Sequence, residues 1–327
     1  MSLLSAEVRA ASERPDGGNG APPAAPPPPA PSPRPTRARG RPAVSPTPAL
    51  DILRSGLIVL SLLATSLAFH LVVVSSLQHA SAQQRAYSTF RRTVAEGTAP
   101  SGPTGPDGRQ LAHGTPVAFL EIPTIGVSEV IGEGTTGADL MSGPGHRRDS
   151  PLPGQTGTSV VLGRQASYGG PFNRLADLKA GDKIRATTGA GISTFTVISL
   201  RYGGEPTPPP LRSGEGRLLL VSAAGPSYVP SQVLRVDADL ETTAIKAPPA
   251  VVKVSALPRN EQLMAADTTT LWRLVFWLQA LLVVVLGIVW AWHRWGRAQT
   301  WIVFFPLTAL VGLLSSAEAV RLLPNLL

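Results

Sequence analysis

Long apolar runs and short alternating runs divide this sequence into two kinds of region. The long apolar runs cover residues 56–77, 271–292 and 301–323. A helix of about 20 mostly apolar residues is long enough to cross a bilayer. We therefore predict three transmembrane helices over these ranges.

Between the first two apolar runs, residues 116–257 have the pattern of a β-rich domain. Short stretches rich in Val, Ile, Leu, Thr and Phe alternate with Gly/Pro turns, which is typical of strands. The predicted strands are Val117–Ile122, Ser128–Ile131, Ser159–Gly163, Lys183–Thr188, Ser193–Leu200, Arg217–Ala223 and Gln232–Leu240. Short helices are expected over Ala138–Met141 and Pro171–Leu178. Many short strands separated by turns favour a closed β-barrel, so the predicted fold is mainly β with three transmembrane α-helices.

Two further segments have polar or Pro-rich composition. Residues 1–50, rich in Pro, Ala, Gly and Ser, have too little apolar surface to offset the entropy of ordering and are predicted to be disordered. Residues 79–115 are predicted to form a polar stalk. Because the first apolar run follows a leader much longer than a signal n-region, we expect a retained signal anchor. The small-residue pattern Ala80-Ser81-Ala82 leaves cleavage open as an alternative.

Basic residues next to the apolar runs predict an orientation. The connecting segment, residues 293–300, contains Arg294 and Arg297 and no acidic residue, and residues 34–41 form a second basic run without acids. Segments of this kind stay in the cytoplasm. We therefore expect a multi-pass plasma-membrane protein with a cytoplasmic N-terminus and loop and an extracytoplasmic barrel.

Composition excludes several classes of function. The sequence contains no cysteine, which rules out disulfides, thiolate metal sites and a thiol nucleophile. The net charge is +8, but no basic stripe with interleaved aromatic residues lies in the predicted barrel, so no nucleic-acid partner is expected. No cluster of His, Asp and Glu has metal-ligand spacing, so neither a metal nor another cofactor is predicted.

Several short motifs follow one another in the barrel region. They are Ile122-Pro123, Glu133-Gly134-Thr135, Gly143-Pro144-Gly145-His146 and Tyr168-Gly169-Gly170-Pro171-Phe172. In this order and spacing they resemble the sortase family of Gram-positive bacteria, and are most similar to its actinobacterial, class E-like members. The resemblance extends over residues 115–241 and implies a barrel at the outer membrane face.

The resemblance also implies which positions would carry the chemistry of a sortase. Members of the family use a Cys thiolate as nucleophile, a His for proton transfer and an Arg for the developing oxyanion. Here Arg164 stands at the His position, Ala223 at the Cys position and Val233 at the Arg position, with Arg235 on the same strand face. Since arginine stays protonated and alanine has no nucleophile, we expect a catalytically degenerate pseudo-sortase that is not an enzyme.

Other side chains are candidates for binding near these positions. Ser222 adjoins the Cys position, and the motif residue His146 is the histidine that could serve it as a base. Arg164 with Arg147 and Arg148 could form a basic mouth for a carboxylate or phosphate. The ligand-binding candidates are therefore Arg164, His146, Arg147, Ser222 and Arg235.

The sequence leads to one preferred function and two alternatives. We expect an inactive sortase-like binding or scaffold subunit of a cell-envelope complex, holding an extended peptide or partner protein in the barrel groove. The first alternative is an active transpeptidase or hydrolase with non-standard residues. The second is a structural subunit that acts through its spans, where the polar residues His70 and Gln279 could contact partner membrane subunits.

Overall fold

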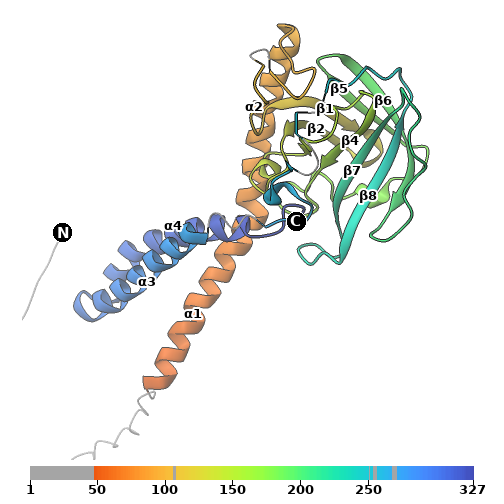
Figure 1. Ribbon diagram of the computed structural model, residues 1–327. Coiled ribbons are helices and arrows are strands. Elements are labelled where there is room, and N and C mark those ends of the chain that lie inside the picture. The colour runs from red at the N-terminus through yellow and green to blue at the C-terminus, as the bar shows by residue number, and fades with distance from the viewer. Residues whose placement is uncertain (1–47, 106–107, 250, 253–255, 267–270) are drawn as a thin grey trace, which may run out of the picture. The chain divides into compact units, whose positions relative to one another are not determined.

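The computed structural model describes residues 48–327 apart from 106–107, 250, 253–255 and 267–270 (Figure 1). Residues Leu50–Leu327 form one compact unit. The predicted disordered tail, residues 1–50, lies outside the described residues except for its last three, which begin the first helix.

Eight strands close into a barrel in the order β1-β2-β3-β4-β7-β8-β6-β5, which confirms the predicted fold class. The strands are β1 (Pro116–Ile122), β2 (Val127–Glu133), β3 (Gly145–His146), β4 (Gly157–Leu162), β5 (Lys183–Thr188), β6 (Gly191–Arg201), β7 (Gly216–Ala224) and β8 (Gln232–Leu240). Most neighbours are antiparallel, but β2 pairs with β3 and β4 with β7 in parallel. The pattern of apolar residues had not indicated β3, which is only two residues long.

Alternating burial along the strands places the barrel core. On β5, for example, Ile184, Ala186 and Thr188 are buried while the residues between them are more exposed, as expected for one face turned inward. The core residues include Val117, Leu120, Ile122, Val161, Phe172, Ile184, Phe195, Leu218, Leu220, Leu234 and Val236. Short 3₁₀ turns connect the strands, namely η2 (Pro123–Ile125), η3 (Asp139–Met141) and η4 (Leu175–Asp177), and η6 (Arg259–Glu261) follows the barrel.

A long helical segment precedes the barrel. Helix α1 (Pro48–Phe69) continues through the π-helical turn η1 (His70–Val74) into α2 (Ser75–Ala95). The structure is therefore helical through the first half of the segment predicted as a polar stalk. Helix α2 contacts the barrel through side chains of its own: the Tyr87 and Phe119 rings lie 5.2 Å apart between centroids, and His79 Nε2 lies 3.0 Å from Glu129 Oε1.

Two helices follow the barrel, α3 (Leu271–Arg294) and α4 (Arg297–Arg321). Over the described residues, three helical stretches are long and apolar enough to cross a membrane, within Leu60–Ala95, Leu271–Trp292 and Ala298–Arg321. The predicted spans are thus present as candidate membrane helices. The two polar residues singled out in these helices differ in exposure: His70 is buried and Gln279 is exposed.

Candidate functional site at the ends of β4 and β7

Strands β7 and β8 bring two of the singled-out positions together. Ala223 on β7 pairs directly with Val233 on β8, and Arg235 pairs two residues further back with Val221. Strand β4 runs parallel to β7 with Leu162 beside Val221, so the residues after Leu162 reach the same end of the barrel as Ala223. The site is defined as this end: Gly163, Arg164, Gln165, Ala223 and Val233.

Arg164 is buried completely, which rules out the open alternative that it forms a basic mouth with Arg147 and Arg148. Its Nε donates to Leu140 O at 3.2 Å, its Nη2 to Gly137 O at 2.7 Å, and its Nη1 to Leu327 O at 2.7 Å. Nη1 also lies 3.1 Å from Ser167 Oγ. A guanidinium is a rigid group with five N–H donors, and here all but one of its hydrogen bonds go to main-chain oxygens.

Local sequence explains how Arg164 is positioned. The preceding residue is Gly163, where an added Cβ would collide with the Phe172 ring, so only glycine lets β4 end against that ring. Tyr168, which has a left-handed backbone (φ 51°), turns its ring toward the guanidinium, with Arg164 Cζ 5.1 Å from the ring centroid. Such a cation–π contact favours the charged form of the arginine.

Burial lowers the pKa of Arg164 to about 10, and the nearby Tyr168 offsets part of that lowering. Burial likewise raises the pKa of Tyr168, which Arg164 and then Arg321 oppose. Near neutral pH the arginine is therefore charged and the tyrosine neutral. Near neutral pH the site thus holds a buried cation surrounded by oxygen acceptors, which suits it to binding carbonyl or carboxylate oxygens.

The segment after α4 lies against this site. Asn325, Leu326 and Leu327 are buried, and the two leucines belong to one apolar cluster whose other buried members are Leu140, Val160, Leu162, Val221 and Ala223. Full burial of a leucine side chain contributes about 1.5–3 kcal/mol. The predicted third span ended at residue 323 and this contact was missed, although the Leu326-Leu327 pair beyond Arg321 and Pro324 is a signal for a second apolar contact.

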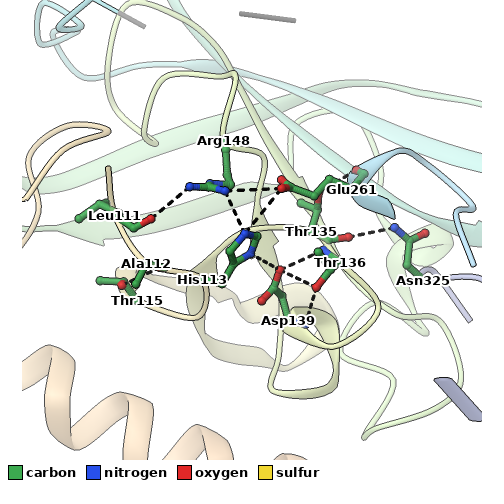
Figure 2. A network of polar contacts seen from close by, with 10 residues as sticks. All are labelled: Leu111, Ala112, His113, Thr115, Thr135, Thr136, Asp139, Arg148, Glu261 and Asn325. Carbon is green, nitrogen blue, oxygen red and sulfur yellow. Dashed lines mark hydrogen bonds and ion pairs between the residues drawn. The ribbon is translucent and has the colours of Figure 1, made fainter. Parts of the chain in front are cut away.

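A polar network on the neighbouring loops supports the same segment (Figure 2). His113 Nδ1 lies 2.8 Å from Asp139 Oδ2, and Arg148 Nη1 donates to His113 Nε2 at 2.9 Å. Glu261 Oε1 lies 3.6 Å from Arg148 Nη1 and 3.7 Å from His113 Nε2, while the Glu261 carbonyl oxygen accepts from Thr135 Oγ1.

This network ends at Asn325, whose Nδ2 donates to Thr135 O and to Gln262 O, each at 2.9 Å. The main-chain N–H of Asn325 donates to Ala265 O at 2.9 Å. The loops that carry Thr135 and residues 262–265 thereby hold Asn325, and Figure 2 shows its contact with Thr135.

His146 takes part in an arrangement that looks like a Ser-His-Glu triad but is bonded differently. Its Nδ1 lies 2.8 Å from Glu133 Oε2, and its Nε2 lies 3.2 Å from Ser150 Oγ and 3.0 Å from Pro151 O. A carbonyl oxygen can only accept, so Nε2 donates to Pro151 O and is not a base toward Ser150. The Ser150 hydroxyl itself donates to Arg147 O at 2.7 Å.

The remaining candidates lie apart from one another. Ser222 is buried and donates to Gly163 O at 2.9 Å, whereas His146 pairs with Val161 on the other edge of β4, so the two do not meet. Arg147 pairs with Asp149 and Arg148 joins the network of Figure 2. The three arginines that could have formed a basic mouth therefore lie in three separate environments.

A depression of about 380 Å³ adjoins the site. Its lining includes Gln165, Asn173, Ala223, Ser231 and Gln232. It lies at the same end of β7 and β8 as the Ala223–Val233 pair. Ala223 therefore borders a depression that is open to solvent. Over the described residues, no group of three or more His, Asp and Glu side chains is arranged to hold a metal ion.

Comparison with known proteins gives the family. Residues 120–206 match the Sortase domain. The chain contains a sortase domain. Over 83 residues it is 34% identical to Sortase D of Bacillus subtilis (strain 168), an alignment that covers 25% of this chain and 40% of that protein. The chain thus spans well under half the length of this relative.

Solved structures of sortases are also similar. A Clostridium perfringens Sortase D5 transpeptidase is 21% identical, with a TM-score of 0.41 over 50% of this chain and 99% of that one. Sortase E from Streptomyces avermitilis is 28% identical, with a TM-score of 0.35 over 41% of this chain and 92% of that one.

The prediction that this protein is not an enzyme is contradicted by these matches. The matched domain and the relative at 34% identity are both named as sortases, which points to an enzyme family. That prediction took the residue types at three positions as sufficient to decide activity. The assignment of Arg164, Ala223 and Val233 to the catalytic positions of the family stays a prediction from the motifs.

Proposed function

We propose that this sortase-domain protein binds an extended polypeptide of the cell envelope at the site formed by Arg164, Gln165 and Ala223. One observation carries the proposal: two successive residues of this site donate to successive main-chain oxygens of a distant segment. Arg164 Nη1 donates to Leu327 O at 2.7 Å, and Gln165 N donates to Leu326 O at 2.9 Å. Main-chain hydrogen bonds of this kind bind peptides, and apolar pockets beside them select side chains.

We further propose that the barrel works outside the cytoplasm, held at the membrane as a binding or scaffold subunit. The candidate spans and the basic segment between α3 and α4 support this orientation. Contacts between α2 and the barrel begin at Ser75, whose Oγ accepts from Tyr168 N. The barrel is therefore held directly by the helix that continues the first candidate span.

Site-specific photo-crosslinking tests the binding role. A photoreactive amino acid is placed at Gln232, which lines the depression beside Ala223, and in a matched variant at Arg185, an exposed residue of β5. In cells, the Gln232 variant is expected to crosslink to a defined envelope polypeptide, identified by mass spectrometry, and the Arg185 variant is not. Equal crosslinking of both variants to the same polypeptides would contradict the proposal.

Acyl transfer is the second candidate function, and the Sortase domain match favours it. The chain has no cysteine, so transfer would need another nucleophile, and Ser222 is the hydroxyl beside Ala223. Purified full-length protein is incubated with an amine and with the polypeptide that the crosslinking experiment identifies, and the products are analysed by mass spectrometry. Amide-exchanged product that is lost in Ser222→Ala, with binding retained, would favour transfer over binding alone.

A further inference from the structure

The segment that follows α4 is held at the site through its main chain. Gln165 N donates to Leu326 O, and Arg164 Nη1 and Ser167 Oγ both donate to Leu327 O. Asn325 N donates to Ala265 O. The segment is thus bound in the way an extended peptide would be, by donors that the sortase domain supplies.

Its side chains complete that description. Leu326 and Leu327 pack in the same apolar cluster as Ala223, and Asn325 is held by two carbonyl oxygens through its amide. The site therefore matches one polar amide side chain followed by two aliphatic ones. Its chemistry, a buried cation with apolar walls, selects carbonyl oxygens flanked by aliphatic side chains.

The attachment is of a kind that can exchange. Across the described strands, the pairings of β4 and β7 do not include residues 325–327, so no ladder of hydrogen bonds has to break when the segment leaves. The depression that opens to solvent shares Gln165 and Ala223 with the site. A competing chain can therefore reach the site without opening the barrel.

We infer that residues 325–327 are an intramolecular ligand of the sortase domain, and that an external peptide with a similar aliphatic pair must displace them to reach Arg164. This inference rests on the proposed peptide-binding function. If Leu327 departs, Arg164 Nη1 and Ser167 Oγ lose an acceptor inside a buried site. Because unpaired buried donors are unfavourable, the site is expected to be occupied by one chain or the other.

The absence of cysteine makes a direct test available in the full-length protein in lipid nanodiscs. Leu327→Cys, at a buried position, is compared with Thr207→Cys, at an exposed one, for the rate of maleimide labelling. We expect labelling at residue 327 to be at least about 10-fold slower, because its thiol reacts only while the segment is detached from the site and the attached state is more populated. Addition of the synthetic peptide Arg-Leu-Leu-Pro-Asn-Leu-Leu is expected to raise that rate, and a scrambled peptide is not.

A second measurement uses a variant that ends after Leu323. A fluorescently labelled form of the same synthetic peptide is expected to bind this variant at least about 10-fold more tightly than the full-length protein, because residues 325–327 no longer compete for the site. Equal affinity of both proteins would overturn the intramolecular ligand and leave the proposed function standing. Absence of binding to both, with no crosslink at Gln232, would overturn the two together. Labelling of Leu327→Cys as fast as Thr207→Cys would also overturn the inference.

Discussion

A guanidinium removed from water is tolerated only where its N–H groups find acceptors. Arg164 meets this condition with oxygens of Gly137, Leu140 and Leu327. The residue at the predicted His position is therefore an organising centre for the loops around it. The motif singled out Arg164 as a candidate site residue, but its burial depends on a segment 163 residues further along the chain.

Glu261 is the residue for which a pH effect on stability is expected. Burial raises the pKa of its carboxyl, and the attraction of Arg148 and then His113 offsets part of this shift, while Asp139 adds to it. The folded protein therefore binds this proton more tightly than the unfolded chain does. The stabilising contribution is complete below the unfolded pKa and is lost as the pH rises through the folded pKa.

The variant Glu261→Gln tests this expectation because glutamine is neutral at every pH. Relative to the wild type, its free energy of unfolding should increase as the pH rises from about 4, near the unfolded pKa of glutamate, toward neutral. The measurement is thermal unfolding in nanodiscs across that range. Exposed Glu205, changed to Gln, is the control and should show no such trend. A difference between Glu261→Gln and wild type that stays constant with pH would show that Glu261 is not the titrating group.

At the scale of elements, helix α2 completes the edge of strand β2. Strand β3 pairs only with Gly132 and Glu133, which leaves the earlier part of that edge without a strand partner. The Gln83 amide takes this place: Val130 N donates to Gln83 Oε1 at 2.8 Å, and Gln83 Nε2 donates to Val130 O at 3.1 Å. An open strand edge is a liability, and here one side chain covers it.

Replacing Gln83 by Ala is expected to destabilise the barrel by about 1–3 kcal/mol, because two main-chain groups of Val130 lose their partners. Amide hydrogen exchange should accelerate at Val130 and be measured together with thermal unfolding. The matched control is Gln84→Ala, an exposed neighbour on the same helix, which should change stability by less than about 0.5 kcal/mol. Equal effects of the two substitutions would contradict the role assigned to Gln83.

The strands themselves were largely predictable, while this contact was not. The bounds of β5 and β8 agree with the predicted ranges to the residue, because alternation of apolar residues is a local property. The polar composition of residues 79–115 predicted a stalk, in which Gln83 would lie in solvent. A glutamine in solvent and a glutamine that pairs with a strand edge look the same in sequence, so only the packing of α2 against β2 distinguishes them.

At the scale of the molecule, helices that are candidate membrane spans lie both before and after the barrel in the chain. Helix α2 continues the first span and binds the barrel at Ser75, His79 and Gln83, and α4 leads within a few residues to the segment held by Arg164. The helices are therefore joined to the candidate site through short chain segments. A shift of α4 would act on the site through residues 322–327.

The orientation of the spans is tested in intact bacterial cells with a membrane-impermeant maleimide. Thr207→Cys, in an exposed barrel loop, should be labelled from outside. Gln299→Cys, at the exposed start of α4, should be labelled only after the cells are permeabilised, since the basic segment between α3 and α4 is expected in the cytoplasm. The reverse pattern would place the barrel inside and contradict the proposed function as a whole.

Local patterns in the sequence were enough to predict the candidate membrane helices, most strands and the sortase resemblance. Each depends on residues close together in the chain, where periodicity, length and motif spacing are informative. The folded chain was needed to show that Arg164 is buried, that His146 is engaged by Glu133 and Pro151, and that residues 325–327 occupy the site. These features arise from contacts between separate segments, whose energies depend on which groups face each other after the chain has folded.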